Sequence, residues 1–229
     1  MSFDPSVLPD ITGLTVGILG GTGPQGRGLA YRLAVAGHPV VIGSRTDQRA
    51  HTTAAELAAL PGVSAGLRGG SNHEAAGADL VIVAVPWEGH AATLSALRER
   101  LAGRIVVDCV NPLGFDARGP YPLPVPEGSA AEQAAALLPQ ARVCAAFHHV
   151  SAPLLADPAL PPLDQDVLVL GDDREAVAVV QALASRLPGV RGIAAGRLRN
   201  AGQVEALTAN LLAVNRRYRA HAGLRLTGL

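Results

Sequence analysis

Residues Leu14–Leu33 read LTVGILGGTGPQGRGLAYRL, a short apolar run followed by a glycine-rich turn and by apolar residues at helical spacing. The apolar run suits a buried strand. The spacing Gly21-x-Gly23-x-x-Gly26 supplies a tight turn, a bare backbone for close phosphate approach and close packing of helix on strand. Pro24 fits the first position of a helix, whose free N–H groups and dipole favour an anion. The stretch therefore predicts the pyrophosphate site of a dinucleotide.

The next segment decides whether this glycine motif has the right context. A second apolar run, Pro39–Gly43, follows the helical residues, so the stretch predicts a complete β-α-β unit. A glycine turn that merely connects a strand to a helix is the alternative. The position of the motif between a strand and a helix favours the dinucleotide site.

The end of the second strand indicates which dinucleotide binds. An NAD site usually has Asp or Glu about twenty residues past the glycines, where it accepts from the ribose 2′-hydroxyl. This chain has Gly43-Ser44-Arg45 there, and Arg49 lies one helical turn further along the same face. A hydroxyl and a guanidinium both donate to a 2′-phosphate. The sequence therefore predicts NADP(H), with solvated surface arginines as the alternative.

Composition narrows the possible classes of function. The chain has 229 residues and a formal net charge of zero, so we expect no nucleic-acid partner. The longest apolar run, Leu80–Trp87, is too short to span a membrane, and Met1–Pro9 does not read as a secretory signal, so we expect a cytoplasmic protein. All nineteen basic residues are arginines, which excludes lysine chemistry such as Schiff-base formation. Cys109 and Cys144 read as reduced core residues.

The rest of the chain alternates helical and strand patterns, which predicts an α/β fold: a Rossmann-type doubly wound, mainly parallel sheet with a small C-terminal α/β appendage. We expect an NADP-binding domain over residues 1–150 and a C-terminal part over residues 151–229. The expected strands after Gly43 are Asp79–Val85, Arg104–Asp108, Ala141–Phe147, Asp166–Leu170 and a weak one over Val190–Ala194. The expected helices are Asp47–Leu60, Asn72–Gly77, Gly89–Arg100, one from a capping box at Ser129 to Leu138, one from Asp173 to Leu187, and Leu198–Arg219.

Several stretches between these elements attract attention. The glycine-rich residues 66–70 read as a connection, and the clustered prolines of Gly114–Gly128 exclude a regular helix or a central strand.

Trp87, the only tryptophan, follows the strongest strand, where open α/β sheets place ligands. The alternative is that Trp87 only fills space in the core or on the surface. His148 and His149 leave another strand, but no third ligand stands at metal spacing, so we expect no metal. The apolar stripe of the last helix packs on the core or on a partner subunit.

Together these residues resemble the NADPH-dependent reductases of the deazaflavin coenzyme F420 over nearly the whole chain. The resemblance rests on Gly20–Gly23, Gly43–Arg45, Val85–Glu88, the strand exit at His148, Val169–Asp173 and Glu205–Thr208. It implies an oxidoreductase that transfers a hydride between NADP(H) and F420, with a site between the Rossmann domain and the C-terminal part. It also implies a homo-oligomer, either a dimer or a tetramer.

The resemblance assigns contacts residue by residue. It implies NADP contacts from Thr22, Gly23, Pro24, Gln25, Ser44, Arg45, Arg49, Trp87, Ala91 and Ala152. It implies deazaflavin contacts from His148, Val150 and Leu224, with His148 orienting the ring rather than transferring a proton. Arg49 stands where a lysine is familiar in the family, which keeps the charge but changes the donor geometry.

Two other functions stay open. One is an NADP-dependent reductase of another small substrate, although the β-hydroxyacid type relies on a lysine and the short-chain type needs Tyr-x-x-x-Lys, and the chain has no lysine. The other is a sensor that binds NADP without turnover. Reduction of the deazaflavin by NADPH would separate these alternatives from the F420 reductase.

Overall fold

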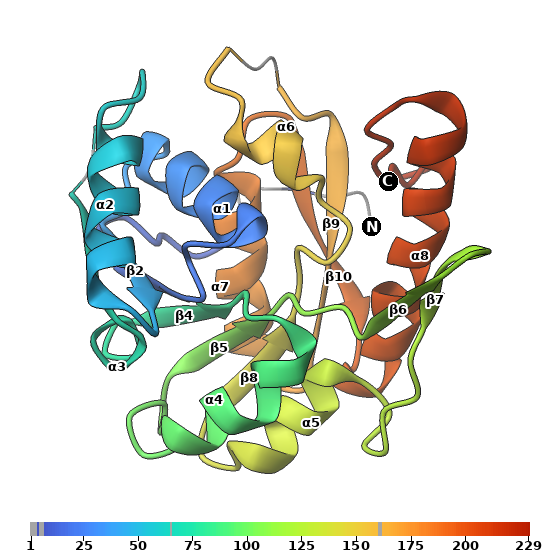
Figure 1. Ribbon diagram of the computed structural model, residues 1–229, viewed down its shortest axis with the longest axis horizontal. Coiled ribbons are helices and arrows are strands. Elements are labelled where there is room, and N and C mark those ends of the chain that lie inside the picture. Colours follow the sequence, from blue (N-terminus) through green and yellow to red (C-terminus); the bar gives the residue numbers. More distant parts are fainter. Residues whose placement is uncertain (1–3, 5–6, 65, 160–161) are drawn as a thin grey trace.

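The computed structural model describes the whole chain except residues 1–3, 5, 6, 65, 160 and 161. Its described residues form a central sheet of eight strands in the order β10-β9-β8-β5-β4-β1-β2-β3 (Figure 1). The neighbouring strands run parallel except β8 and β9, which are antiparallel. These strands are β1 (Val16–Leu19), β2 (Val40–Ser44), β3 (Leu67–Ser71), β4 (Leu80–Val83), β5 (Ile105–Asp108), β8 (Arg142–Ala145), β9 (Gln165–Gly171) and β10 (Val190–Gly196).

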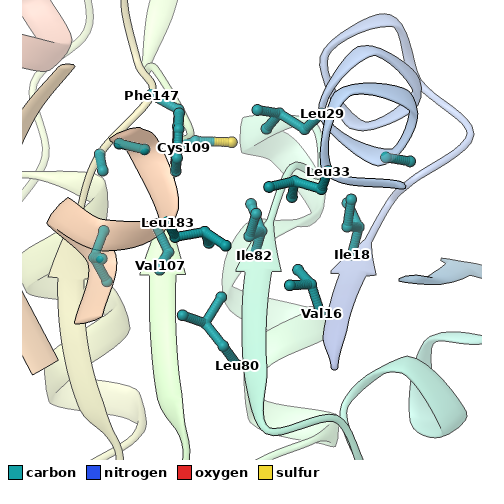
Figure 2. Packing of buried hydrophobic residues seen from close by; sticks show 14 of the residues in the cluster. Val16, Ile18, Leu29, Leu33, Leu80, Ile82, Val107, Cys109, Phe147 and Leu183 are labelled. Atoms are coloured by element: carbon teal, nitrogen blue, oxygen red, sulfur yellow. The ribbon is translucent and has the colours of Figure 1, made fainter. Parts of the chain in front are cut away.

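Helices cover both faces of this sheet, as a doubly wound fold requires. The helices are α1 (Pro24–Val35), α2 (Asp47–Ala58), α3 (Asn72–Ala75), α4 (His90–Ala96), α5 (Ala130–Leu137), α6 (Ala152–Ala156), α7 (Arg174–Ser185) and α8 (Ala201–Tyr218), with 3-10 turns η2 (Trp87–Gly89) and η3 (Leu198–Asn200). One core, under α1, α2, α6 and α7, takes alternate strand residues such as Ile18 and Ile82, and Leu29 and Leu33 of α1 pack on them (Figure 2). The other core takes the intervening residues, such as Leu19 and Val83, under α3, α4, α5 and the start of α8.

Strand β3 lies where the sequence predicted only a connection, over residues 66–70, so that prediction was wrong. This segment pairs in parallel with β2 along its whole length. A Cβ added to Gly69 would lie 2.3 Å from the carbonyl carbon of Ala50 in α2. Gly69 therefore allows α2 to approach the strand closely. Because glycine has a low strand propensity, the composition of this segment does not predict a strand.

The proline-rich segment contains a small hairpin where a loop was expected. Strands β6 (Leu113–Asp116) and β7 (Gly119–Pro122) pair antiparallel and form a sheet of their own. Phe115 pairs with Pro120, and Leu113 pairs with Pro122. Proline is tolerated here because this sheet has only edge strands, and no central strand is formed, as the prolines predicted. The hairpin lies beside α8 through β7 (Figure 1).

The C-terminal third extends the same sheet. Strands β9 and β10 continue it past β8, and α7 begins at its predicted cap, where the Asp173 carboxylate accepts from the Ala176 N–H at 3.0 Å. Helix α6 was not predicted, and the helices α2 and α4 end earlier than expected, at Ala58 and Ala96. Helix α8 buries Val204 near its start but exposes Val214, so its apolar stripe packs on the core only over its first half. A domain boundary at residue 150 stays a prediction.

Candidate functional site

The glycine turn connects β1 to α1, and no side chain caps the N-terminus of the helix that follows it. Helix α1 begins at Pro24, as predicted, and its N-cap residue Gly23 offers no side chain to cap the first turn. The turn itself is fixed from outside, because the Gly20 N–H donates to Asn72 Oδ1 at 3.2 Å and the Gly21 N–H donates to the Gly43 carbonyl at 2.9 Å. A rigid helix N-terminus without a side-chain cap is the arrangement that binds a phosphate.

The glycines of the motif have different roles. A Cβ at Gly21 would lie 2.9 Å from Ile42 Cγ2, and a Cβ at Gly26 would lie 2.6 Å from the Gly21 Cα, so both positions serve close packing. Gly20 has a φ of +70°, a left-handed conformation that side chains disfavour. A Cβ at Gly23 would meet only the Gly20 carbonyl, at 3.5 Å, in the described structure. Gly23 therefore leaves room for a ligand rather than for protein.

The end of β2 presents the hydroxyl and the guanidinium groups that the sequence predicted. Ser44 is buried, and its Oγ accepts from the Thr46 N–H at 3.2 Å, which fixes its position at the rim. Arg45 and Arg49 are exposed, and within the described residues neither guanidinium has an acidic partner. Two unpaired cations beside a hydroxyl fit the charge of a 2′-phosphate.

A large pocket of about 990 Å³ joins these two features. Its wall includes the predicted residues Thr22, Gly23, Pro24, Gln25, Ser44, Arg45 and Arg49. The pocket lies outside the carboxyl ends of the first strands, where open α/β sheets bind nucleotides. Size, donors and charge all fit NADP(H).

A second pocket of about 390 Å³ lies further along the same edge of the sheet. Trp87, His148, Val150 and Ala152 line it, as do Thr208 and Asn215 of α8. The two pockets share Gln25, Ala84, Val85 and Pro86 in their walls. A ligand in one pocket can therefore reach a ligand in the other across this shared wall.

Gln25 connects the two sides of the shared wall. Its Nε2 donates to the Phe147 carbonyl at 3.1 Å, which ties the start of α1 to the exit of β8. Phe147 has a φ of +65°, a conformation that costs free energy for a residue other than glycine. Its ring is fully buried, so packing holds this strained turn in place (Figure 2).

The backbone of His148 is held from two further elements. Its carbonyl accepts from Asn111 Nδ2 at 2.9 Å and from Thr208 Oγ1 at 3.1 Å. Burial lowers the pKa of His148 to about 4, and the smaller opposing effects of Asp108 and of the backbone at Cys109 and Val110 do not restore it. The imidazole is therefore neutral near pH 7. It can donate or accept one hydrogen bond but cannot serve as a cationic acid.

Two residues that line the smaller pocket, His148 and Asn111, have buried polar atoms without hydrogen-bond partners in the described part of the chain. The ring nitrogens of His148 and the Oδ1 of Asn111 have no hydrogen-bond partner of good geometry among the described residues, although the backbone at Cys109 and Val110 lies close enough to His148 to raise its pKa slightly. Buried polar atoms without good partners are costly, and both residues line this pocket, so they give its wall a polar part. The lining is otherwise largely apolar, so this pocket fits a flat heteroaromatic ring with a polar edge.

The remaining predicted contacts lie apart from both pocket walls. Ala91, in α4, is exposed and is not among the residues that line either pocket. Leu224 lies in the C-terminal tail, where its carbonyl accepts from the Asp166 N–H at 2.7 Å. Its neighbour Ala222 does line the smaller pocket. The roles of Ala91 and Leu224 stay predictions.

Several polar residues at this site were not predicted from the sequence. Asn72 fixes the glycine turn, and Asn111 and Thr208 hold the His148 backbone. His90 and Asp108, which lie 2.7 Å apart and fully buried behind Trp87, were not predicted either. Asp108 was recognisable as the polar end of an apolar strand, but nothing local indicated its partner.

Two negative observations concern metals and membranes. The described residues contain no group of three or more His, Cys, Asp or Glu side chains arranged to hold a metal ion. Within the same part of the chain, no helix has both the length and the apolar character needed to cross a bilayer.

Known proteins with similar sequences include reductases that depend on coenzyme F420 and NADP. Residues 15–112 match the family model described as NADP oxidoreductase, coenzyme F420-dependent. The chain is 38% identical to the F420-dependent NADP reductase of Methanothermobacter thermautotrophicus, over 94% of this chain and 96% of that protein. The reductase of the same name from Methanocaldococcus jannaschii is also 38% identical, over 94% of this chain and 99% of its own.

A solved structure agrees with these relatives. The protein from Arthrobacter sp. FB24, which carries the provisional name of F420-dependent NADP reductase, superposes with a TM-score of 0.76 at 29% identity. The match covers 94% of this chain and 100% of that one. The doubly wound fold predicted from the sequence is confirmed by this neighbour and by the sheet order.

Proposed function

The chain belongs to the family of coenzyme F420-dependent NADP oxidoreductases, and from that premise we propose that it transfers a hydride between NADP(H) and coenzyme F420. The observation that carries this proposal is the pair of adjoining pockets with a shared wall at Gln25 and residues 84–86. One pocket has the anion-binding turn and the arginines, and the other has the apolar lining with an unsatisfied polar edge.

In this proposal the larger pocket holds NADP(H). The free N–H groups at the start of α1 hold the pyrophosphate, and Ser44, Arg45 and Arg49 hold the 2′-phosphate. The nicotinamide end then lies towards the shared wall. Trp87 and Ala152 line the smaller pocket, so their contact would be with the nicotinamide end or with the second ring.

The smaller pocket holds the deazaflavin in this proposal. His148 and Val150 line the side next to the shared wall, and the neutral imidazole of His148 orients the polar edge of the ring. Both bound molecules bring their own redox chemistry, the hydride moving between the nicotinamide and the deazaflavin rings. The protein supplies binding, alignment and exclusion of water, and alignment alone can lower a barrier by several kcal/mol.

Mixing the purified protein with NADPH and oxidised F420 tests this function. We expect the deazaflavin absorbance to disappear at a rate proportional to protein concentration. We also expect the rate with NADH to be much lower than the rate with NADPH. A sensor would bind NADPH without this loss of colour. A reductase of another small substrate would oxidise NADPH only when that substrate is added.

We further propose that the protein is a cytoplasmic homo-oligomer. Exposed apolar side chains lie on two neighbouring elements, with Leu212, Val214 and Tyr218 on α8 and Phe115 and Tyr121 on the β6–β7 hairpin. A second copy would cover them. Light scattering measures the mass in solution, and a monomer at micromolar concentration would contradict the proposal. Fractionation of the producing cells tests the location.

A further inference from the structure

A group of ionisable side chains lies buried behind the wall of the smaller pocket, where the proposed reaction does not use it directly. His90 at the start of α4 and Asp108 at the end of β5 are fully buried, and Glu205 of α8 is 3% exposed. The His90 Nε2 lies 2.7 Å from Asp108 Oδ2, and the His90 Nδ1 lies 2.9 Å from Gln133 Oε1. Burying these three ionisable side chains costs free energy, so we expect them to serve a function in the folded protein.

The hydrogen-bond pattern fixes the protonation state of His90. Asp108 presents a carboxylate oxygen, which accepts. The Gln133 amide nitrogen donates to Glu127 Oε2 at 3.2 Å, so the amide oxygen is the atom that faces His90. Both ring nitrogens of His90 must then donate, and only the imidazolium carries two N–H groups. A charged His90 against a charged Asp108 also explains how each is tolerated inside the protein.

The pKa of His90 is raised, which agrees with this geometry. Burial by itself lowers the pKa of His90, but the hydrogen bond and the charge of Asp108, together with Gln133 and Glu205, outweigh burial and raise it. Glu205 is itself held by the N–H groups of Ala130 and Ala131, at 2.9 and 3.2 Å, and so caps α5.

Two contacts connect the ion pair to the pocket. The His90 ring packs against the Trp87 indole with 5.4 Å between ring centroids and 32° between planes. The other carboxylate oxygen of Asp108 accepts from the Val110 N–H at 3.0 Å, which fixes the turn after β5. Trp87 and Val110 both line the smaller pocket. The pair therefore holds two parts of the same wall from behind.

We propose that His90, paired with Asp108, is a positioning residue that holds the Trp87 ring and the turn after β5 as one wall of the deazaflavin subsite. The inference rests on the function proposed above, because it assigns this wall to the deazaflavin. His90 acts through Trp87 and Val110, and it lines neither pocket itself. Its loss therefore weakens deazaflavin binding more than NADP(H) binding, because Trp87 and Val110 line only the smaller of the two pockets.

The variant His90→Gln tests this, with His73→Gln as the matched control on exposed α3. Trp87 is the only tryptophan, so all tryptophan emission of the protein comes from the side chain that His90 contacts. An imidazolium beside an indole quenches its fluorescence, and we expect brighter emission from the His90 variant. We also expect the KM for F420 to rise by about tenfold, while the Kd for NADPH changes much less. The His73 variant should match the wild type in all three measurements.

Two results would overturn the proposal. One is unchanged emission together with an unchanged KM for F420. The other is an equal loss for NADPH and F420 with a lower melting temperature, because a merely structural residue would give that result. If the wild type fails to reduce F420, the proposed function fails, but the emission comparison still tests the contact between His90 and Trp87.

A milder variant keeps the proposal testable if His90→Gln does not fold. Gln133 is half-buried in α5, and Gln133→Met removes one acceptor from the His90 ring without removing a buried charge. The account expects a smaller rise in the KM for F420 and no change in NADPH affinity. A KM equal to that of the wild type would overturn it.

Discussion

The side chain of Gln25 donates to the carbonyl of Phe147 at 3.1 Å, across 122 positions of sequence. Gln25 stands in the first turn of α1, beside the expected pyrophosphate, and Phe147 immediately precedes His148. This bond therefore ties the larger pocket to the turn that lines the smaller one. In the function proposed above, it would set the relative position of the two bound rings.

Substitution of Gln25 tests this coupling. Gln25→Leu keeps the side-chain size but removes one of the two donors to the Phe147 carbonyl, leaving the Val150 N–H at 3.3 Å. The loss of one such hydrogen bond costs about 0.5–1.5 kcal/mol. We expect kcat to fall by about tenfold or more, because misalignment of bound reactants affects the transition state most. NADPH affinity, measured by calorimetry, should change less than kcat. An unchanged kcat would show that the bond does not align the site.

Arg45→Ala tests the choice of NADP(H) over NAD(H). A charge-assisted hydrogen bond contributes about 1.5–3 kcal/mol, so NADPH should bind roughly ten- to hundredfold more weakly. NADH affinity should stay nearly constant because NADH has no 2′-phosphate. Arg118→Ala is the control, since Arg118 is exposed on the β6–β7 hairpin. Equal losses for NADPH and NADH would mean that Arg45 is structural.

The glycine turn permits a test that separates binding from folding. Gly23→Val places a side chain where the protein leaves space, so the protein should fold and lose both nicotinamide cofactors. Gly26→Val should instead destabilise the fold, because its Cβ would lie 2.6 Å from the Gly21 Cα. Thermal unfolding and calorimetry on the two variants measure both effects. Near-native NADPH affinity in a folded Gly23 variant would disprove the pyrophosphate assignment.

His148 should act by orientation and not by proton transfer. His148→Ala should lower kcat by well under the hundred- to ten-thousandfold expected for loss of a general acid or base. Because burial lowers the pKa of His148 to about 4, its ionisation should leave no inflection in kcat between about pH 6 and 8. A larger loss in kcat, with an inflection near neutral pH that the variant lacks, would assign proton transfer to His148.

The same pKa has a consequence for stability. In the unfolded chain a histidine titrates near about 6.5, so on acidification the unfolded state binds the proton first. The stability contributed by neutral His148 is present above about pH 6.5 and is lost as the pH falls towards 4. Urea unfolding at pH 7 and pH 5 should show a smaller pH effect in His148→Ala than in the wild type. His73→Gln, on the surface, should behave like the wild type.

The sequence predicted the elements that local patterns define. The glycine spacing, the apolar runs of β1, β2, β4 and β5, and the cap at Asp173 each depend on residues that lie close in sequence, and the structure has all of them. Ser44, Arg45 and Arg49 also share one pocket wall with the glycine turn, because the β-α-β unit places them there.

The features that sequence patterns missed depend on distant contacts. Strand β3 contains Gly69 where α2 lies against it and Gly70 where the Glu74 side chain of α3 does, so its composition resembles that of a turn. The pairing of His90 with Asp108, and the bond from Gln25 to Phe147, join elements that only the folded sheet brings together. Tertiary contacts of this kind leave no periodic signal in the sequence.

NADPH labelled stereospecifically with deuterium tests whether the hydride passes directly from one pocket to the other. The reaction should be run in ordinary water with oxidised F420, and the reduced deazaflavin should be analysed by mass spectrometry and NMR. The account predicts that the deuterium appears on the reduced ring carbon. A product that carries only solvent hydrogen there, with later exchange excluded by incubating labelled product with the enzyme, would contradict it.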